Sequence, residues 1–251
     1  MNRRRALALL PAGMVLAAIG TKAGELQKPE RLNLASFSSA RPSETPPEGW
    51  RPVVVDAKRP QTQFSLVTDD GTTVLRAHAK AAASAVARDM PFDTLAYPRL
   101  QWRWKTARLI ERSNIAEKSG DDFPLRLYVL FDYDITRLPF GARTKLRLGR
   151  MMFGDALPTA ALCYVWATRE PVGTIVANAY TDRVRMVVVA SGPARLNEWV
   201  SVERDIDADF RTAFGEPPPA VTGIVLATDT DDTGEEAVSH FGDIAALRAR
   251  R

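Results

Sequence analysis

Oxygen-bearing side chains are concentrated in one short segment near the end of the chain. Residues 229–235 read Asp-Thr-Asp-Asp-Thr-Gly-Glu, and residues 223–228 and 240–244 on either side have the apolar composition of β-strands. This arrangement predicts a strand, an acidic turn and a second strand, with several oxygen ligands crowded into the turn.

Metal binding is the first chemistry that this segment could perform. Asp229, Asp231 and Thr233 stand at the first, third and fifth positions of a D-x-D-x-x-G pattern, and Gly234 permits the turn. Ca²⁺ takes six to eight hard oxygen ligands, so we expect these three residues to be candidate ligands of a structural Ca²⁺. An EF-hand is excluded, because the twelfth position is His240 and no helix follows. The alternative is a solvated polar hairpin whose threonines cap backbone groups.

Paired carboxylates are the second candidate for chemistry. Glu203, Asp205 and Asp207 alternate along one predicted strand, and Asp121 and Asp122 are adjacent. Glycosidases use two carboxyl groups at a set separation, so Glu203 with Asp205, or Asp121 with Asp122, could serve a hydrolase or lyase. A surface strand carrying salt bridges explains the same residues without catalysis.

The third candidate is a polar face on the predicted sheets. If Leu127 and Val129 point into a core, the alternating residues Arg126, Tyr128 and Asp132 point the other way. Sugar rings present C–H faces and rows of hydroxyl groups, which aromatic rings and planar polar side chains recognise. The tyrosine would stack and the arginines would hold hydroxyl groups or uronate carboxylates. The predicted ligand-binding set is Arg103, Arg126, Tyr128, Asp132 and Arg185.

Nucleophilic catalysis has little support. Cys163 is the single cysteine and lies in an apolar strand pattern, so it is predicted to be a small buried hydrophobe. A catalytic thiol would need His78 or His240, the two histidines, as a base.

These side chains are positioned by elements with a period of two residues. Alternation of apolar and polar residues over many short segments predicts an all-β, antiparallel, jelly-roll-like β-sandwich, with a closed barrel as the alternative. Asp69-Asp70-Gly71 predicts the turn of a hairpin. The alternating segments are 64–68, 73–78, 100–105, 126–132, 162–166, 183–188 and 200–203.

Two short peripheral helices are expected beside the strands. The segment 140–151 has Phe140 and Leu148 on one face and Arg143, Arg147 and Arg150 on another, which fits a lid or a helix on a membrane surface. The second helix begins at a predicted N-cap, Asp207, and ends at Gly215.

The two ends of the chain differ in composition from the folded body. A basic start and a short apolar run predict a signal peptide at 1–23 and a periplasmic or secreted location. A linker and entry segment at 24–49, one sandwich domain at 50–247 and a basic tail at 248–251 follow. The formal net charge is +4, and Arg3, Arg4 and Arg5 supply three of these charges. The remaining domain is therefore nearly neutral, which argues against nucleic-acid binding.

Several motifs together resemble the exported bacterial domain-of-unknown-function family 3047. They are residues 97–105, 120–124, 126–129, 162–166, 180–185, 228–231 and 241–244. The family has no established activity, so the resemblance implies a domain over about 50–245 and no chemistry. The closing strands also resemble, at the level of the fold, galactose-binding-like jelly rolls of carbohydrate-binding modules.

We therefore expect an exported β-sandwich that binds a glycan or another envelope component without catalysis. Two alternatives stay open: a jelly-roll hydrolase or lyase that uses the paired carboxylates, and a structural envelope protein whose basic helix around Arg147 contacts lipid.

Overall fold

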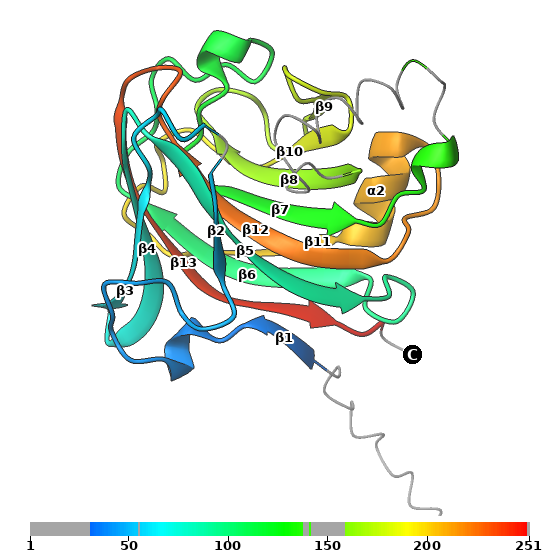
Figure 1. The fold of residues 1–251 in the computed structure, drawn as a ribbon, viewed down its shortest axis with the longest axis horizontal. Helices are drawn as coiled ribbons and strands as arrows, with labels where there is room; N and C mark the ends of the chain where they lie inside the picture. The colour runs from blue at the N-terminus through cyan, green and yellow to red at the C-terminus, as the bar shows by residue number, and fades with distance from the viewer. Residues whose placement is uncertain (1–30, 55, 138–140, 142–158, 250–251) are drawn as a thin grey trace, which may run out of the picture.

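The computed structural model describes residues 31–54, 56–137, 141 and 159–249, and within them the chain folds into two stacked β-sheets (Figure 1). The expected all-β sandwich is confirmed. The predicted signal peptide and almost all of the predicted basic helix lie outside the described residues.

Within the described part of the chain, one sheet has seven strands and the other has six. The seven-stranded sheet runs in the order β2 (Arg51–Val53), β5 (Ala83–Phe92), β12 (Val221–Asp229), β7 (Arg126–Phe131), β8 (Ala160–Ala167), β10 (Val184–Ser191) and β9 (Ile175–Ala177). The six-stranded sheet runs in the order β11 (Val200–Asp205), β6 (Arg99–Thr106), β13 (Glu236–Leu247), β4 (Thr72–Lys80) and β3 (Gln63–Asp69), with β1 (Arg31–Ala35) beside β13.

The predicted alternation places one set of side chains between the sheets. Leu100, Trp102 and Trp104 of β6 are buried there, together with Leu127 and Val129 of β7. The indole rings of Trp102 and Trp104 meet edge to face, with 5.4 Å between their centroids. Since β7 alternates strictly, its even-numbered residues lie on the outer face of the seven-stranded sheet.

Strands β8 and β10 depart from the expected pattern in two ways. They pair in parallel, so the larger sheet is mixed and not purely antiparallel. Strand β8 is also buried along its whole length. A second apolar cluster, which includes Ile115 and Phe123, packs on its outer face. Val184 and Met186 of β10 belong to this outer cluster.

The two predicted turns have different outcomes. The β3–β4 hairpin is confirmed: Asp69 pairs with Thr72, and Asp70 and Gly71 both have positive φ, as a two-residue turn of this type requires. The acidic turn between β12 and β13, in contrast, is not a hairpin. Strand β12 belongs to the larger sheet and β13 to the smaller one, so this connection crosses between the layers.

The segment predicted to be a linker is partly integral to the sandwich. Residues of β1 pair with β13, and Phe37 in the following 3₁₀ helix (Phe37–Ser39) is buried against Trp50, with 5.4 Å between the ring centroids. The folded body therefore begins by Arg31 and not at residue 50. The prediction failed because a short strand whose pairing partner is distant in the sequence has no strong local signal.

Helix α2 (Ile206–Phe214) follows β11 and packs at one end of the sandwich (Figure 1). Its N-cap is Asp205, whose side chain accepts a hydrogen bond from the Ala208 amide, and not the predicted Asp207. Gly215 closes the helix with a φ of 76°, as predicted. Within the described residues, no helix is long and apolar enough to cross a membrane.

The buried carboxylate of Asp209 ties α2 to both sheets. Its Oδ2 accepts hydrogen bonds from the Tyr164 hydroxyl at 2.9 Å and from Arg204 Nε at 2.9 Å, and Arg204 Nη2 bonds Oδ1. Asp209→Ala would leave the Tyr164 hydroxyl buried without an acceptor and Arg204 without its counter-charge.

We expect Asp209→Ala to lower the free energy of unfolding by roughly 2–4 kcal/mol, measured by urea denaturation. Asp207→Ala is the control, because Asp207 pairs with Arg211 on the helix surface and should change stability far less. Equal losses in the two variants would contradict a structural role for Asp209.

Candidate functional site

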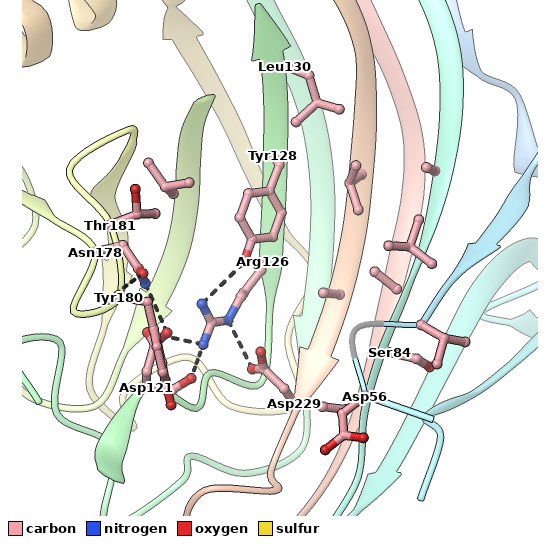
Figure 2. Close-up of a pocket in the computed structure, with 18 of the residues that line it drawn as sticks. Asp56, Ser84, Asp121, Arg126, Tyr128, Leu130, Asn178, Tyr180, Thr181 and Asp229 are labelled. Carbon is pink, nitrogen blue, oxygen red and sulfur yellow. Dashed lines mark hydrogen bonds and ion pairs between the residues drawn. The ribbon is translucent and has the colours of Figure 1, made fainter. Parts of the chain in front are cut away.

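A groove with a volume of about 690 Å³ lies on the outer face of the seven-stranded sheet. Its floor is formed by β5, β12 and β7, where the side chains facing the groove alternate with the core residues. Figure 2 shows Asn178, Tyr180 and Thr181 on one side of it, with Ser84 and Asp56 on the other.

The floor is deep because its side chains are small. Ala85 and Ala87 of β5 lie beside Ala227 and Val225 of β12, which the antiparallel register places opposite them. An alanine projects little above a sheet, so the groove extends close to the backbone. The floor is therefore an apolar strip between polar walls.

Arg126 is the central charged residue of the site, and it is buried, with 2% of its side chain exposed. Its Nε donates to Asp229 Oδ1 at 2.9 Å and its Nη1 donates to the Tyr128 hydroxyl at 3.2 Å. Its Nη2 bonds the Asp121 carbonyl and lies 3.3 Å from Asp121 Oδ1 (Figure 2). The guanidinium group thus joins β7, β12 and the segment before β7.

Electrostatics keep this group charged. Burial alone would lower the pKa of Arg126, but the carboxylates of Asp121 and Asp229 raise it well above its usual value. Burial raises the pKa of Asp229 to about 7, against the lowering effect of Arg126, and the nearby Asp122 adds to the rise. Asp229 also accepts a hydrogen bond from the Phe123 amide at 2.9 Å.

A nucleophilic role for the cysteine is not supported by its surroundings. Cys163 is fully buried beneath the site, and burial raises the pKa of its thiol to about 12. Of the histidines, His78 bonds Glu236 at 2.7 Å, and His240 packs edge-on against Trp199. The predicted burial of Cys163 is confirmed.

One wall of the groove carries an exposed aromatic ring. Tyr180 is 56% exposed, and the single proton of its hydroxyl is shared between two acceptors, Asp232 Oδ2 at 3.1 Å and the Lys118 carbonyl oxygen at 3.3 Å. Burial and the Asp232 carboxylate raise the pKa of Tyr180 to about 12, so the hydroxyl stays protonated. Asn178 Nδ2 donates to Asp121 Oδ2 at 2.9 Å, which connects this wall to the Arg126 network.

The opposite wall and the far end carry charged groups that are open to solvent. Arg51 of β2 pairs with Asp89 of β5 at 3.3 Å, with both side chains more than half exposed. Arg59 Nη1 lies 3.6 Å from Asp231 Oδ2. In total, seven carboxylates and three guanidinium groups are among the described residues that line the groove.

The structure brings three of the five predicted ligand residues together. Arg126, Tyr128 and Asp132 all line the groove: the first two are successive outward residues of β7, and Asp132 follows the last residue of that strand. Arg126 is nevertheless buried beneath its ion pairs, which corrects the expectation of a free guanidinium on the surface. Tyr128 is half-buried, and its hydroxyl accepts from Arg126.

Arg103 and Arg185 lie elsewhere. Arg103 belongs to β6 in the other sheet, where its guanidinium stacks 4.5 Å from the ring centroid of Trp199. Arg185 shares the face of Leu162, its partner in register, opposite the face of Tyr128, and it lies over Phe214 of α2. The prediction failed for Arg185 because Val184, Met186 and Val188, which alternate with it, pack in the outer cluster and not in the main core.

The three predicted metal ligands do not face one common point. Asp231 lies close to two other carboxylates, those of Asp122 and Asp232. Asp229 instead faces Arg126, and Thr233 uses its backbone N–H to donate to Asp122 Oδ2 at 2.6 Å. The loop is also more buried than a solvated hairpin, since Thr233 is 3% exposed.

The first proposed catalytic pair does not converge in a cleft. Glu203 pairs with Arg99 at 2.6 Å on the six-stranded sheet, and Asp205 caps α2. Asp121 and Asp122 do lie near the groove, but Asp121 is paired with Arg126. The salt-bridge interpretation holds for Glu203 on β11 and for Asp207, which pairs with Arg211 within α2, whereas Asp205 caps the helix.

Sequence reasoning missed the wall of Asn178, Tyr180 and Thr181 as a site. These residues lie in the connection between β9 and β10, outside any segment with a period of two. A further signal was present but unused: the outward-facing residues of β5 and β12 are unusually small, as a deep floor requires.

The comparisons with known proteins concern the family and the fold. The model of family DUF3047, described as a protein of unknown function, matches residues 48–245. No curated protein matches the chain. Among solved structures, a family 30 carbohydrate-binding module of a cellulosomal cellulase from Clostridium thermocellum is similar at 11% identity, with a TM-score of 0.38, over 88% of this chain and 99% of that one.

Two further structures are similar to the chain. A family 12 xyloglucanase from Bacillus licheniformis is 8% identical, with a TM-score of 0.45, over 87% of this chain and 100% of that one. A winged bean acidic lectin is 10% identical, with a TM-score of 0.32, over 88% and 100% of the two chains.

The Arg126 network predicts a structural role that mutation can test. Arg126→Met would leave Asp121 and Asp229 without their buried counter-charge, and we expect it to lower the free energy of unfolding by about 3–5 kcal/mol in urea denaturation. Arg51→Met is the matched control in the same groove, because its ion pair is exposed and should contribute little. A well-folded Arg126→Met protein with parental stability would overturn this assignment.

Proposed function

Because this chain belongs to family DUF3047, whose function is unknown, we propose its function from the groove itself: it binds a neutral polysaccharide without cleaving it. The observation that carries the proposal is the open groove with an apolar floor, polar walls and an exposed tyrosine ring.

The dimensions and floor of the groove support a sugar chain as the ligand. A volume of about 690 Å³ is within the usual range of binding sites for small molecules and for short stretches of a polymer. The floor of Ala85, Ala87, Ala227 and Val225 presents an apolar strip to the C–H groups of a pyranose ring. Lining residues come from the neighbouring strands β2, β5, β12 and β7 and from the wall of Asn178, Tyr180 and Thr181, so the site runs across the sheet.

Tyr180 supports a stacking interaction. Its ring is more than half exposed at the groove wall, and its hydroxyl is anchored to Asp232 and to the Lys118 carbonyl. A ring held in this way loses little freedom when a sugar stacks on it, which favours binding.

The walls supply the polar complement. Asp56, Asp89 and Asp132 are exposed carboxylates that can accept hydrogen bonds from sugar hydroxyl groups, and Thr181 and Thr222 can both donate and accept. Charge-assisted hydrogen bonds of this kind are stronger than neutral ones.

The charges favour a neutral ligand over an acidic one. Each of the three lining arginines already has a carboxylate partner, and Arg126 is buried. Seven carboxylates line the groove, so a polymer of uronates would meet repulsion. The proposal therefore replaces the expectation that arginines hold uronate carboxylates.

The test is a binding measurement by calorimetry and affinity gels on the mature protein. Cellohexaose, xylohexaose and mannohexaose represent neutral chains, and polygalacturonate and alginate represent acidic ones. We expect saturable binding to at least one neutral chain and none to the acidic polymers. Tyr180→Ala should weaken binding about tenfold, because the stacking surface is lost.

Two controls define the outcome. Tyr180→Phe keeps the ring and should bind within about threefold of the parent. Leu95→Ala changes a side chain that is 76% exposed outside the groove lining and should bind like the parent. Absence of binding to every neutral chain would overturn the proposal, and release of reducing ends would replace it with hydrolysis.

We further propose that the protein is exported, as the predicted signal peptide at 1–23 implies. Mass spectrometry of the protein from its native host should find a mature N-terminus near residue 21 or 24 in the periplasm or medium. A full-length chain confined to the cytoplasm would contradict export.

A further inference from the structure

Three carboxylates lie together where the β12–β13 connection meets the segment before β7. One oxygen of each of Asp122, Asp231 and Asp232 lies within 4.8 Å of the others. Asp231 and Asp232 are adjacent in the sequence and Asp122 is distant from both, so tertiary structure brings the third negative charge to the other two. A cluster of this kind opposes folding unless a positive charge compensates it.

Asp122 lacks such compensation. It is fully buried, and its Oδ2 accepts the Thr233 amide hydrogen at 2.6 Å. Its Oδ1 is also buried and has no hydrogen-bond partner among the residues that the structure describes. A buried carboxylate oxygen without a donor is costly in a native protein, and a bound cation removes that cost.

The neighbouring cations do not neutralise the cluster. Arg126 is already paired with Asp121 and Asp229, two further carboxylates beside it. Arg59 lies 3.6 Å from Asp231, but about half of its side chain is exposed. Among the described residues, Asp122 and Asp232 have no salt-bridge partner, and Asp232 has a single donor, the Tyr180 hydroxyl.

The backbone around the cluster is held in place. The Gly234 amide bonds the Thr230 carbonyl at 2.9 Å, and the Thr230 amide bonds the Ala82 carbonyl at 2.9 Å. The Phe123 amide donates to Asp229 Oδ1, which fixes the segment carrying Asp122 against β12. The carboxylates are therefore pre-organised and are not side chains of a loose surface loop.

We propose that Asp122, Asp231 and Asp232 together bind one divalent cation, Ca²⁺. Hard oxygen ligands are the donors that Ca²⁺ selects, and oxygens bound to one Ca²⁺ at 2.3–2.6 Å lie within about 5 Å of one another. Of the ligands predicted from the sequence, this set retains Asp231. Asp122 and Asp232 replace Asp229 and Thr233, because Asp229 is committed to Arg126 and Thr233 orients Asp122 through its amide.

The cation site adjoins the groove without depending on it. Asp231 and Asp232 line the groove, and Asp232 accepts the hydroxyl of Tyr180. A cation bound there would fix the wall that carries Tyr180. Binding of Ca²⁺ can be measured without any glycan, so failure of either proposal leaves the other intact.

The experiment is calorimetric titration of the EDTA-treated, dialysed protein with CaCl₂, together with thermal unfolding. We expect one saturable site per chain. The melting temperature should rise by roughly 5–10 °C at a Ca²⁺ concentration of 100 times Kd. No saturable binding by the parent protein would overturn the proposal.

Variants locate the site. Asp232→Asn keeps the Tyr180 contact but removes a charge, so it should bind Ca²⁺ at least about tenfold more weakly. In EDTA its melting temperature should equal or exceed that of the parent, because repulsion within the cluster is relieved. A variant that lost stability in EDTA and kept parental Ca²⁺ affinity would contradict the assignment.

Two further variants complete the set. Asp122→Asn retains an acceptor for the Thr233 amide and should also lose binding; if it fails to fold, Asp232→Asn decides. Asp89→Asn is the matched control, since Asp89 lines the same groove but lies six residues along β5 from the strand end that pairs with Asp229. It should bind Ca²⁺ like the parent, and an equal loss in this variant would count against a local site.

Discussion

The buried guanidinium of Arg126 is the interaction on which the outer face of the larger sheet depends. It joins β7 to Asp229 at the end of β12 and to Asp121 in the segment before β7. Through Asp121 it also reaches Asn178 and the wall of the groove. One residue that was expected to contact a ligand is thus a structural link between the floor and the wall.

This link explains why polar chemistry gathers at one end of the groove. Asp121 and Asp229 are close together because Arg126 compensates them, and the chain then continues on each side into further acids. Asp122 follows Asp121, and Asp231 and Asp232 lie just after Asp229. The contacts that hold Asp121 and Asp229 together on Arg126 therefore also bring these three carboxylates together, and Arg126 does not compensate their charge. The apolar floor of small side chains extends away from this end along β5 and β12.

Local periodicity predicted most of the fold, because alternation along a strand reports which face is buried. It placed Trp102, Trp104 and Leu127 correctly in the core and Tyr128 on the opposite face. It failed for Arg185, since β10 is covered on both faces and alternation cannot tell two apolar environments apart. The site was harder to predict, because Asp122 and Asp232 meet only through the tertiary fold, and Tyr180 lies in a connection without a periodic signal.

The position of the last two strands has a consequence for how the chain reaches its native state. Strand β12 lies between β5 and β7, and β13 lies between β4 and β6, so each sheet receives an interior strand from late in the sequence (Figure 1). Neither sheet can complete its pairing without these two strands, because each of them pairs on both sides with strands from earlier in the sequence. Both sheets are therefore completed by contacts between residues that are far apart in the sequence, and such non-local pairing makes folding slow.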